Sequence, residues 1–185
     1  MMNYDELVDK ISLYEIDLDE EQIFDLLRIK SRWPYTYTNT DMRSVEIITE
    51  TGALTSNFFD VSRRGVWLNF DRWHEYYEKG FTTILSNVFD LTKQLRQLER
   101  MLTSETGLEC LGNFYLGRPG RKPSFDVHTH DYDVIVKQIY GSAEWTLGDT
   151  TLHLQPQQVI HIPKHTPHGV TNSKEKRLSL TINIM

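Results

Sequence analysis

The pattern of apolar and polar positions changes near residue 108. Before that point helical and extended segments are mixed. Residues 17–27 place a capping acid ahead of apolar residues at helical spacing, which predicts a helix. Further predictions are short strands at residues 44–49 and 65–70 and a long amphipathic helix over residues 81–103, ending before Gly107. We therefore expect residues 1–107 to form a helical and mixed N-terminal part.

From residue 108 onward the chain reads as one short strand after another. The segments are rich in β-branched and aromatic residues and are separated by Gly, Pro, Asp or Asn. They are LECLGNFYLG, SFDVHTHDYDVIVKQIY, AEWTLGD, TTLHLQ, QVIHIP, HGVTN and RLSLTINIM. This spacing predicts a small all-β barrel or jelly roll over residues 108–185, so the chain as a whole is mainly β with an N-terminal α part.

Length and composition narrow the class of protein. With 185 residues, of which 39% are hydrophobic, we expect one domain spanning residues 1–185. No apolar run approaches the roughly 20 residues of a membrane-spanning helix, and the acidic N-terminus lacks the features of a secretory signal. The net charge is −6 and the basic residues are scattered. We therefore expect a cytoplasmic protein without a membrane or nucleic-acid partner, and the single Cys110 fits a reducing compartment.

Two histidines in an H-x-H pattern are the main candidates for chemistry. His128 and His130 lie two apart in an extended run, so both side chains face the same side and can approach one metal ion. A third ligand must come from elsewhere. His168, after Pro163 in IPKHTPHGV, is the preferred candidate, and His165 is its main competitor. On its own, an H-x-H pair also fits surface or core histidines.

The surrounding segments resemble the Jumonji-C-like cupin family of iron- and 2-oxoglutarate-dependent oxygenases, including ribosomal-oxygenase-like members. The resemblance covers roughly residues 80–185. It is strongest in HTHDYDVIVKQIYGSAEWTL, where Gln138 leads to a turn at Gly141 and then to Trp145, and in QQVIHIPKHTPHGV, where an I-P pair precedes His168. It implies a double-stranded β-helix (cupin or jelly-roll) barrel with a facial iron site on His128, His130 and His168.

Two departures from the family pattern affect the expected chemistry. The family's acidic ligand is replaced by His130, and three-histidine sites are common in cupin dioxygenases that use no 2-oxoglutarate. Asp126 shares the strand face and is a candidate acceptor for an imidazole N–H, or a ligand. The second departure is that the residues after the glycine turn, 142–144, supply no cation for the far carboxylate of 2-oxoglutarate. Lys137 is nearby, but strand alternation turns it outward.

The last strand offers a substitute cation. Arg177 and Ser179 resemble the R-x-S pair that other 2-oxoglutarate oxygenases use, and an arginine fork can donate two parallel hydrogen bonds to a carboxylate. A solubilising surface charge is the alternative role for Arg177. Asn183 occupies a position where some family members place an asparagine beside the metal, and Tyr115 is expected to reach the pocket.

The resemblance therefore predicts an Fe(II)-dependent oxygenase that uses 2-oxoglutarate to hydroxylate a small molecule or a peptide. Two alternatives stay open. One is a three-histidine dioxygenase without 2-oxoglutarate, and the other is a non-catalytic cupin that binds a metal or ligand. Many cupins dimerise, so a homodimer is one expected assembly.

Overall fold

The computed structural model describes residues 3–35, 44–49, 52–54, 56–119, 126–170 and 174–185. The helices are α1 (Tyr4–Leu13), α2 (Glu20–Arg28), α3 (Phe70–Glu78) and α4 (Lys93–Thr106), with 3₁₀ turns η1 (Lys30–Arg32) and η2 (Val88–Asp90). The strands of the first half are β1 (Val45–Thr49), β2 (Gly52–Leu54), β3 (Phe59–Ser62), β4 (Gly65–Leu68) and β5 (Thr82–Ser86). Those of the second half are β6 (Cys110–Gly117), β7 (Asp133–Tyr140), β8 (Ala143–Leu147), β9 (Thr150–Leu154), β10 (Val159–Ile162), β11 (His168–Val170) and β12 (Arg177–Ile184).

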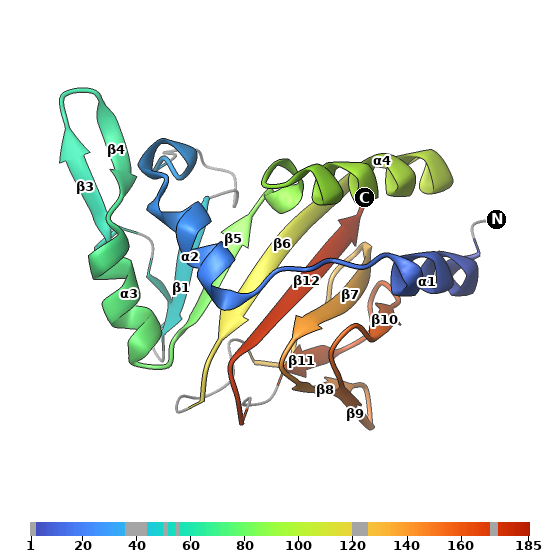
Figure 1. The fold of residues 1–185 in the computed structure, drawn as a ribbon. Coiled ribbons are helices and arrows are strands. Elements are labelled where there is room, and N and C mark those ends of the chain that lie inside the picture. The colour runs from blue at the N-terminus through green and yellow to red at the C-terminus, as the bar shows by residue number, and fades with distance from the viewer. Residues whose placement is uncertain (1–2, 36–43, 50–51, 55, 120–125, 171–173) are drawn as a thin grey trace.

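A large antiparallel sheet organises the chain (Figure 1). Its strand order is β10-β7-β12-β6-β5-β1-β2, and a smaller sheet has the order β11-β8-β9. Strand β12 lies between β6 and β7 and pairs with both along nearly its whole length. The small sheet packs against β7 and β10 through a compact apolar cluster that contains Val136 and Trp145. The chain is mainly β with an N-terminal helical part, as predicted.

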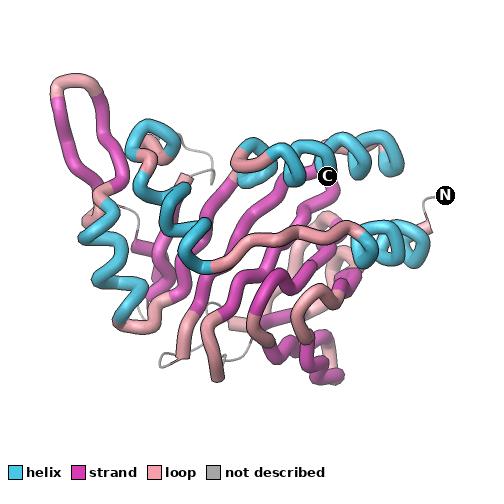
Figure 2. The backbone as a smooth tube through the Cα atoms, viewed as in Figure 1, coloured by secondary structure: helices cyan, strands magenta, loops and turns pink. Residues whose placement is uncertain are grey.

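The other face of the large sheet is covered by helices. Figure 2 shows α1, α2 and α4 beside the strands, whereas the β3–β4 hairpin stands apart at the end next to α3. The main apolar core joins the two layers, with residues such as Leu98 of α4, Ile11 of α1 and Ile23 of α2 packed in one cluster with Leu180 of β12. Each helix has apolar residues on one side because it buries only that side. None of the described helices has both the length and the apolar character needed to span a membrane.

Several predicted elements are confirmed and one is wrong. Helix α2 begins after the capping acid Asp19, and β1 and β4 lie where short strands were predicted. The long helix predicted for residues 81–103 is wrong in its first half. Residues Thr82–Ser86 form β5, which pairs with β1 and β6. Asn87 then adopts a left-handed conformation with φ of 58°, and the helix begins only after its cap Thr92.

Tertiary pairing explains this error. The apolar residues of β5 are buried on both faces, so their spacing satisfies a helical pattern as well as that of a buried strand.

The same long-range pairing shows that the first half of the chain is not a separate layer. Strands β5, β1 and β2 extend the sheet that contains β6, β12 and β7.

The predicted strands of the second half are confirmed, with changes of extent. The strand predicted at residues 168–172 is observed as β11 over residues 168–170, and residues 171 and 172 lie outside the described residues. The segment predicted at residues 124–140 is a strand only from Asp133 to Tyr140, and residues 124 and 125 lie outside the described residues.

The turn at Gly141 has φ of 65°, and a Cβ placed there would lie 2.0 Å from the carbonyl oxygen of Lys176. Glycine is therefore required at the point where β7 turns into β8.

Candidate metal centre

A short backbone pairing brings the two histidine segments together. The amide of His128 donates to the carbonyl of His168 at 3.0 Å, and the amide of His168 donates back at 2.9 Å. His168 is the first residue of β11, whereas His128 lies in the irregular segment before β7. A second link runs from the amide of His165 to the carbonyl of His130 at 2.7 Å. These bonds hold residues 128–130 beside the turn that carries His168.

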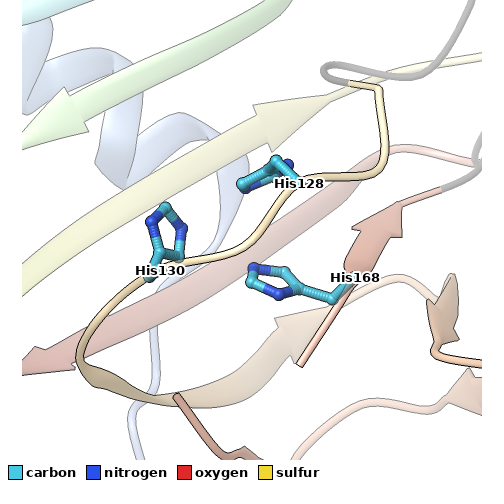
Figure 3. Close-up of side chains that lie close together, drawn as sticks. All are labelled: His128, His130 and His168. Carbon is cyan, nitrogen blue, oxygen red and sulfur yellow. The ribbon is translucent and has the colours of Figure 1, made fainter. Parts of the chain in front are cut away.

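The three imidazole rings point toward one another (Figure 3). Their centroids are 4.9 Å apart for His128 and His130, 4.6 Å for His128 and His168, and 5.2 Å for His130 and His168. One nitrogen of each ring lies within 4.8 Å of the corresponding nitrogen of the other two. Small ring rotations would let one ion contact all three nitrogens.

Backbone carbonyls orient two of the rings. Nδ1 of His128 lies 2.8 Å from the carbonyl oxygen of Asp126, and Nδ1 of His168 lies 2.8 Å from that of Thr166. A carbonyl can only accept, so each Nδ1 carries the proton and each Nε2 keeps its lone pair. Such a bond to the distal nitrogen fixes the tautomer of a metal-binding histidine. Asp126 therefore acts through its backbone, while its side chain is exposed.

The environment of the rings favours neutral imidazoles. Burial lowers the pKa of His130, and the neighbouring rings of His128 and His168 lower it further. Burial also lowers the pKa of His168, which is 4% exposed. The ring of His130 stacks on Tyr132, with centroids 4.7 Å apart and an interplanar angle of 11°. Neutral imidazole is the form that binds a metal ion, so these shifts favour ligation near neutral pH.

The histidines open into a cavity of about 210 Å³ between the two sheets. Its lining residues, beyond the three histidines, are Tyr115, Tyr132, Val134, Trp145, Gly169, Val170, Arg177, Thr181 and Asn183. None of these lining residues, within the described ranges, is acidic. The cavity therefore has a nitrogen-rich wall at the histidines and a cationic group in Arg177.

Arg177 is buried in the cavity wall and is not a surface charge. The residue is 3% exposed, and one guanidinium nitrogen donates to the hydroxyl of Ser179 at 3.0 Å. Burial lowers the pKa of Arg177 to about 10, so the guanidinium remains charged at neutral pH. Burial raises the pKa of Tyr115 to about 12, which keeps its phenol protonated.

Three of the four candidate ligand-binding residues line the cavity, and the fourth lies behind its wall. Arg177, Tyr115 and Asn183 line the cavity itself. Ser179 does not line it among the described residues. Its hydroxyl lies beneath Arg177 and is 2.8 Å from Oε1 of Gln138, to which it donates. Lys137 faces away from the cavity, and its side chain is completely buried. Its ammonium is satisfied there because it donates to the carbonyl of Ile11 at 3.1 Å.

The side chains of the remaining histidines do not belong to the cluster. His165 is exposed and has φ of 64°. His161 bonds Asp133 at 2.8 Å, His153 lies 2.9 Å from Glu144, and His74 lies on α3. Among the described residues, only His128, His130 and His168 form a group of three or more potential metal ligands.

Sequence reasoning did not assign Tyr132, Thr181 or Trp145 to the cavity. Alternation along the last strand already places Thr181 on the face of Arg177, Ser179 and Asn183, but this face alone does not assign it a role. Tyr132 lies in the irregular segment before β7, where strand alternation gives no guide.

The donor set fits a metal ion such as iron or zinc. Imidazole nitrogens suit both metals, and three of them leave further coordination positions for ligands. The fit rests on two oriented Nε2 atoms, a third ring within reach, and a cavity adjoining them.

Comparison with known proteins supports a cupin fold. Residues 118–185 match the family model described as a cupin domain. The structure resembles YcfD, a ribosomal oxygenase from Escherichia coli, with a TM-score of 0.60 and 15% identity over 94% of this chain and 45% of that chain. The chain thus spans less than half the length of that protein. The likeness shows a shared cupin fold, as the sequence predicted.

Other solved structures match only part of the chain. A cupin superfamily protein from Desulfitobacterium hafniense DCB-2 has a TM-score of 0.38 and 20% identity, covering 41% of this chain and 67% of that chain. The lyase DddQ from Ruegeria pomeroyi DSS-3 has a TM-score of 0.38 and 18% identity, covering 41% of this chain and 38% of that chain. No curated protein matches the chain in sequence.

Proposed function

We propose that this cupin-fold protein is an Fe(II)-dependent oxygenase that uses 2-oxoglutarate to hydroxylate a small molecule or a peptide. One observation carries the proposal: three convergent imidazoles and a buried arginine line the same cavity. The histidines would hold the metal, and the arginine would bind the carboxylate of a co-substrate. Bound iron would supply the oxidising chemistry.

The charges in the cavity favour an anionic ligand. Burial favours the neutral form of His130 and His168 by lowering their pKa, a bound divalent ion would add two positive charges, and Arg177 adds a third. No acidic side chain of the described lining residues offsets them. Unbalanced charge is costly beside Arg177 and His168, because both residues are buried away from water. A dicarboxylate such as 2-oxoglutarate would balance much of it.

The residues around the cavity would position the ligand and limit water access. Thr181 presents a hydroxyl group and Asn183 an amide from β12, the strand of Arg177, and Tyr115 presents a hydroxyl group from the neighbouring β6. Val134 and Val170 supply apolar walls. An arginine fork matches a carboxylate geometrically, so the far end of the ligand would be fixed in orientation.

A second function has its own support. The described cluster contains three histidines and no carboxylate, which favours a three-histidine dioxygenase that acts without 2-oxoglutarate. In that case Arg177 would bind an acidic group of the substrate itself.

A spectroscopic experiment separates the candidates. Fe(II) and 2-oxoglutarate are added without oxygen, and the visible charge-transfer band of a metal-bound keto acid is sought. The band, followed by succinate production in air, is the expected result. Substrate-dependent oxygen uptake without succinate would favour the three-histidine dioxygenase. Absence of turnover with any metal would leave a cupin that only binds metal or ligand, and would overturn the proposal.

A further inference from the structure

Arg177 is the end of a buried hydrogen-bonded chain that begins at Gln138 on the neighbouring strand. The amide nitrogen of Gln138 donates to the carbonyls of Tyr140 at 2.7 Å and Leu178 at 3.3 Å. Because both of these partners can only accept, they fix which end of the Gln138 amide carries the N–H groups. Its oxygen must therefore face Ser179.

This orientation sets the direction of the next bonds. The hydroxyl of Ser179 donates its only proton to Gln138 Oε1 at 2.8 Å, so its lone pairs are left to accept from Arg177 at 3.0 Å. Gln138, Ser179 and Arg177 are 0%, 1% and 3% exposed. Water cannot replace any of these bonds without opening the sheet.

Gly117 provides space for the guanidinium on the other side. It is the β6 partner of Arg177, and a Cβ on Gly117 would lie 3.2 Å from Nε of Arg177. A side chain there would crowd the arginine. The guanidinium is thus fixed between a glycine on β6 and an oriented hydroxyl on its own strand.

We propose that Gln138 is a positioning residue: through Ser179 it holds the Arg177 guanidinium in the orientation that binds the far carboxylate of a small dicarboxylate ligand. The inference deepens the proposed function and rests on it for the nature of the site. Gln138 itself does not line the cavity among the described residues, so its effect on ligand binding passes through Arg177.

The test measures ligand affinity separately from metal affinity. Calorimetry on the Zn(II)-loaded protein gives dissociation constants for 2-oxoglutarate, succinate and oxalate in wild type, Gln138→Met, Ser179→Ala and the double variant. Of 2-oxoglutarate and succinate, the one that binds wild type more tightly should have a dissociation constant about tenfold higher in each single variant. The dissociation constant of the double variant should be about that of the more affected single variant, because the two residues act through one hydrogen-bonded chain. Affinity for Zn(II), and for oxalate, which is too short to span the cavity, should not change.

A matched control distinguishes positioning from general loosening. Gln157 is a partly buried glutamine that donates to the carbonyl of Ile139 at 3.0 Å, and it is not among the described residues that line the cavity. Gln157→Met should leave all ligand affinities unchanged. The inference is overturned if Gln138→Met leaves dicarboxylate binding unchanged, if it weakens oxalate and Zn(II) equally, or if wild type binds no dicarboxylate. Tight binding of succinate with no 2-oxoglutarate turnover would instead remove the proposed function and leave the inference standing.

A separate observation points to a second ligand contact. Trp145 is 5% exposed, lines the cavity and packs in the apolar cluster with Val134 and Val136. Its indole nitrogen is buried and has no hydrogen-bond partner within the part of the chain that the structure describes. A buried donor without an acceptor costs about 1–3 kcal/mol, so such groups usually meet a partner when the site is filled.

We infer that the indole N–H of Trp145 donates to an oxygen of the bound ligand. Trp33 is a suitable reference, because its indole N–H already donates to the carbonyl of Leu26 at 2.8 Å. In ¹H–¹⁵N spectra of the Zn(II)-loaded protein, 2-oxoglutarate or succinate should shift the Trp145 indole resonance downfield and leave that of Trp33 in place.

Trp145→Phe identifies the resonance and removes the donor while keeping an aromatic ring. It should weaken the ligand about three- to tenfold without changing Zn(II) affinity. An unmoved Trp145 resonance in the saturated complex, or an unchanged dissociation constant in Trp145→Phe, would overturn the assignment.

Discussion

The two faces of strand β12 have different compositions and different roles. Its even-numbered residues, from 178 to 184, are apolar, buried and part of the helix-covered core. Its odd-numbered residues, from 177 to 183, are polar and lie on the side of the cavity. One strand therefore contributes stability through one face and ligand binding through the other. Substitutions on the two faces should separate these properties.

Strand β7 shows an instructive exception. On its helix-covered face, Ile135 and Ile139 are apolar, but Lys137 and Asp133 are not. Lys137 donates to carbonyls of Ile11 and Ser12 at the end of α1. Asp133 is hydrogen-bonded to Tyr4 at the beginning of the same helix. The two polar residues therefore fix both ends of α1 on the sheet.

The largest expected effect is on the apolar face. Leu180→Ala removes a completely buried side chain from the core and should lower the free energy of unfolding by about 3 kcal/mol. Chemical denaturation measures this change, and metal affinity of the folded protein should be retained. A fall in metal affinity without loss of stability would contradict the division between the two faces.

The converse change removes a metal ligand. His168→Ala should lower affinity for Fe(II) or Zn(II) at least about 100-fold, or roughly 2.7 kcal/mol, because one of three convergent nitrogens is lost. Anaerobic titration measures the affinity. His153→Ala is the matched control, since that histidine is exposed and its side chain lies outside the cluster. Equal effects of the two substitutions would refute the ligand assignment.

Lys137 tests the exception on the helix-covered face. Lys137→Met keeps an unbranched side chain but removes the ammonium that donates to the carbonyls of Ile11 and Ser12, and the carbonyl of Ile11 keeps only the amide of Tyr14 among the described residues. Stability should fall by about 1–2 kcal/mol. Hydrogen exchange should show the loss first in α1. Protection that falls equally throughout the sheet would argue against a local role.

The smallest expected effect is a pH dependence at the other end of α1. Burial alone would raise the pKa of Asp133, but hydrogen bonds from His161 and Tyr4 outweigh it and hold that pKa below its usual range. The carboxylate therefore stabilises the fold above about pH 4, and this contribution is lost as pH falls through the lowered pKa. Asp133→Asn should remove roughly 1 kcal/mol of acid-dependent stability. Parallel unfolding curves of wild type and variant between pH 3 and pH 6 would contradict this.

The candidate site was partly predictable because alternation along a strand is a local property. The polar series that begins at Arg177 could be read as one face of a strand, and the H-x-H pair could be read as two side chains directed to one side. The strand at residues 82–86 could not be recognised in the same way. Its residues are buried on both faces, which removes the alternation that identifies a half-buried strand.

By itself, the sequence determined the succession of strands after residue 108, the cupin-like spacing of its histidines and the polar face of the last strand. Only the tertiary structure decided that β5 joins the main sheet, that Arg177 is buried, and that residues 128 and 168 pair through their backbones. These features depend on hydrogen bonds and packing between segments far apart in the chain. Local periodicity shows which way a side chain points relative to its neighbours, but not which distant segment it meets.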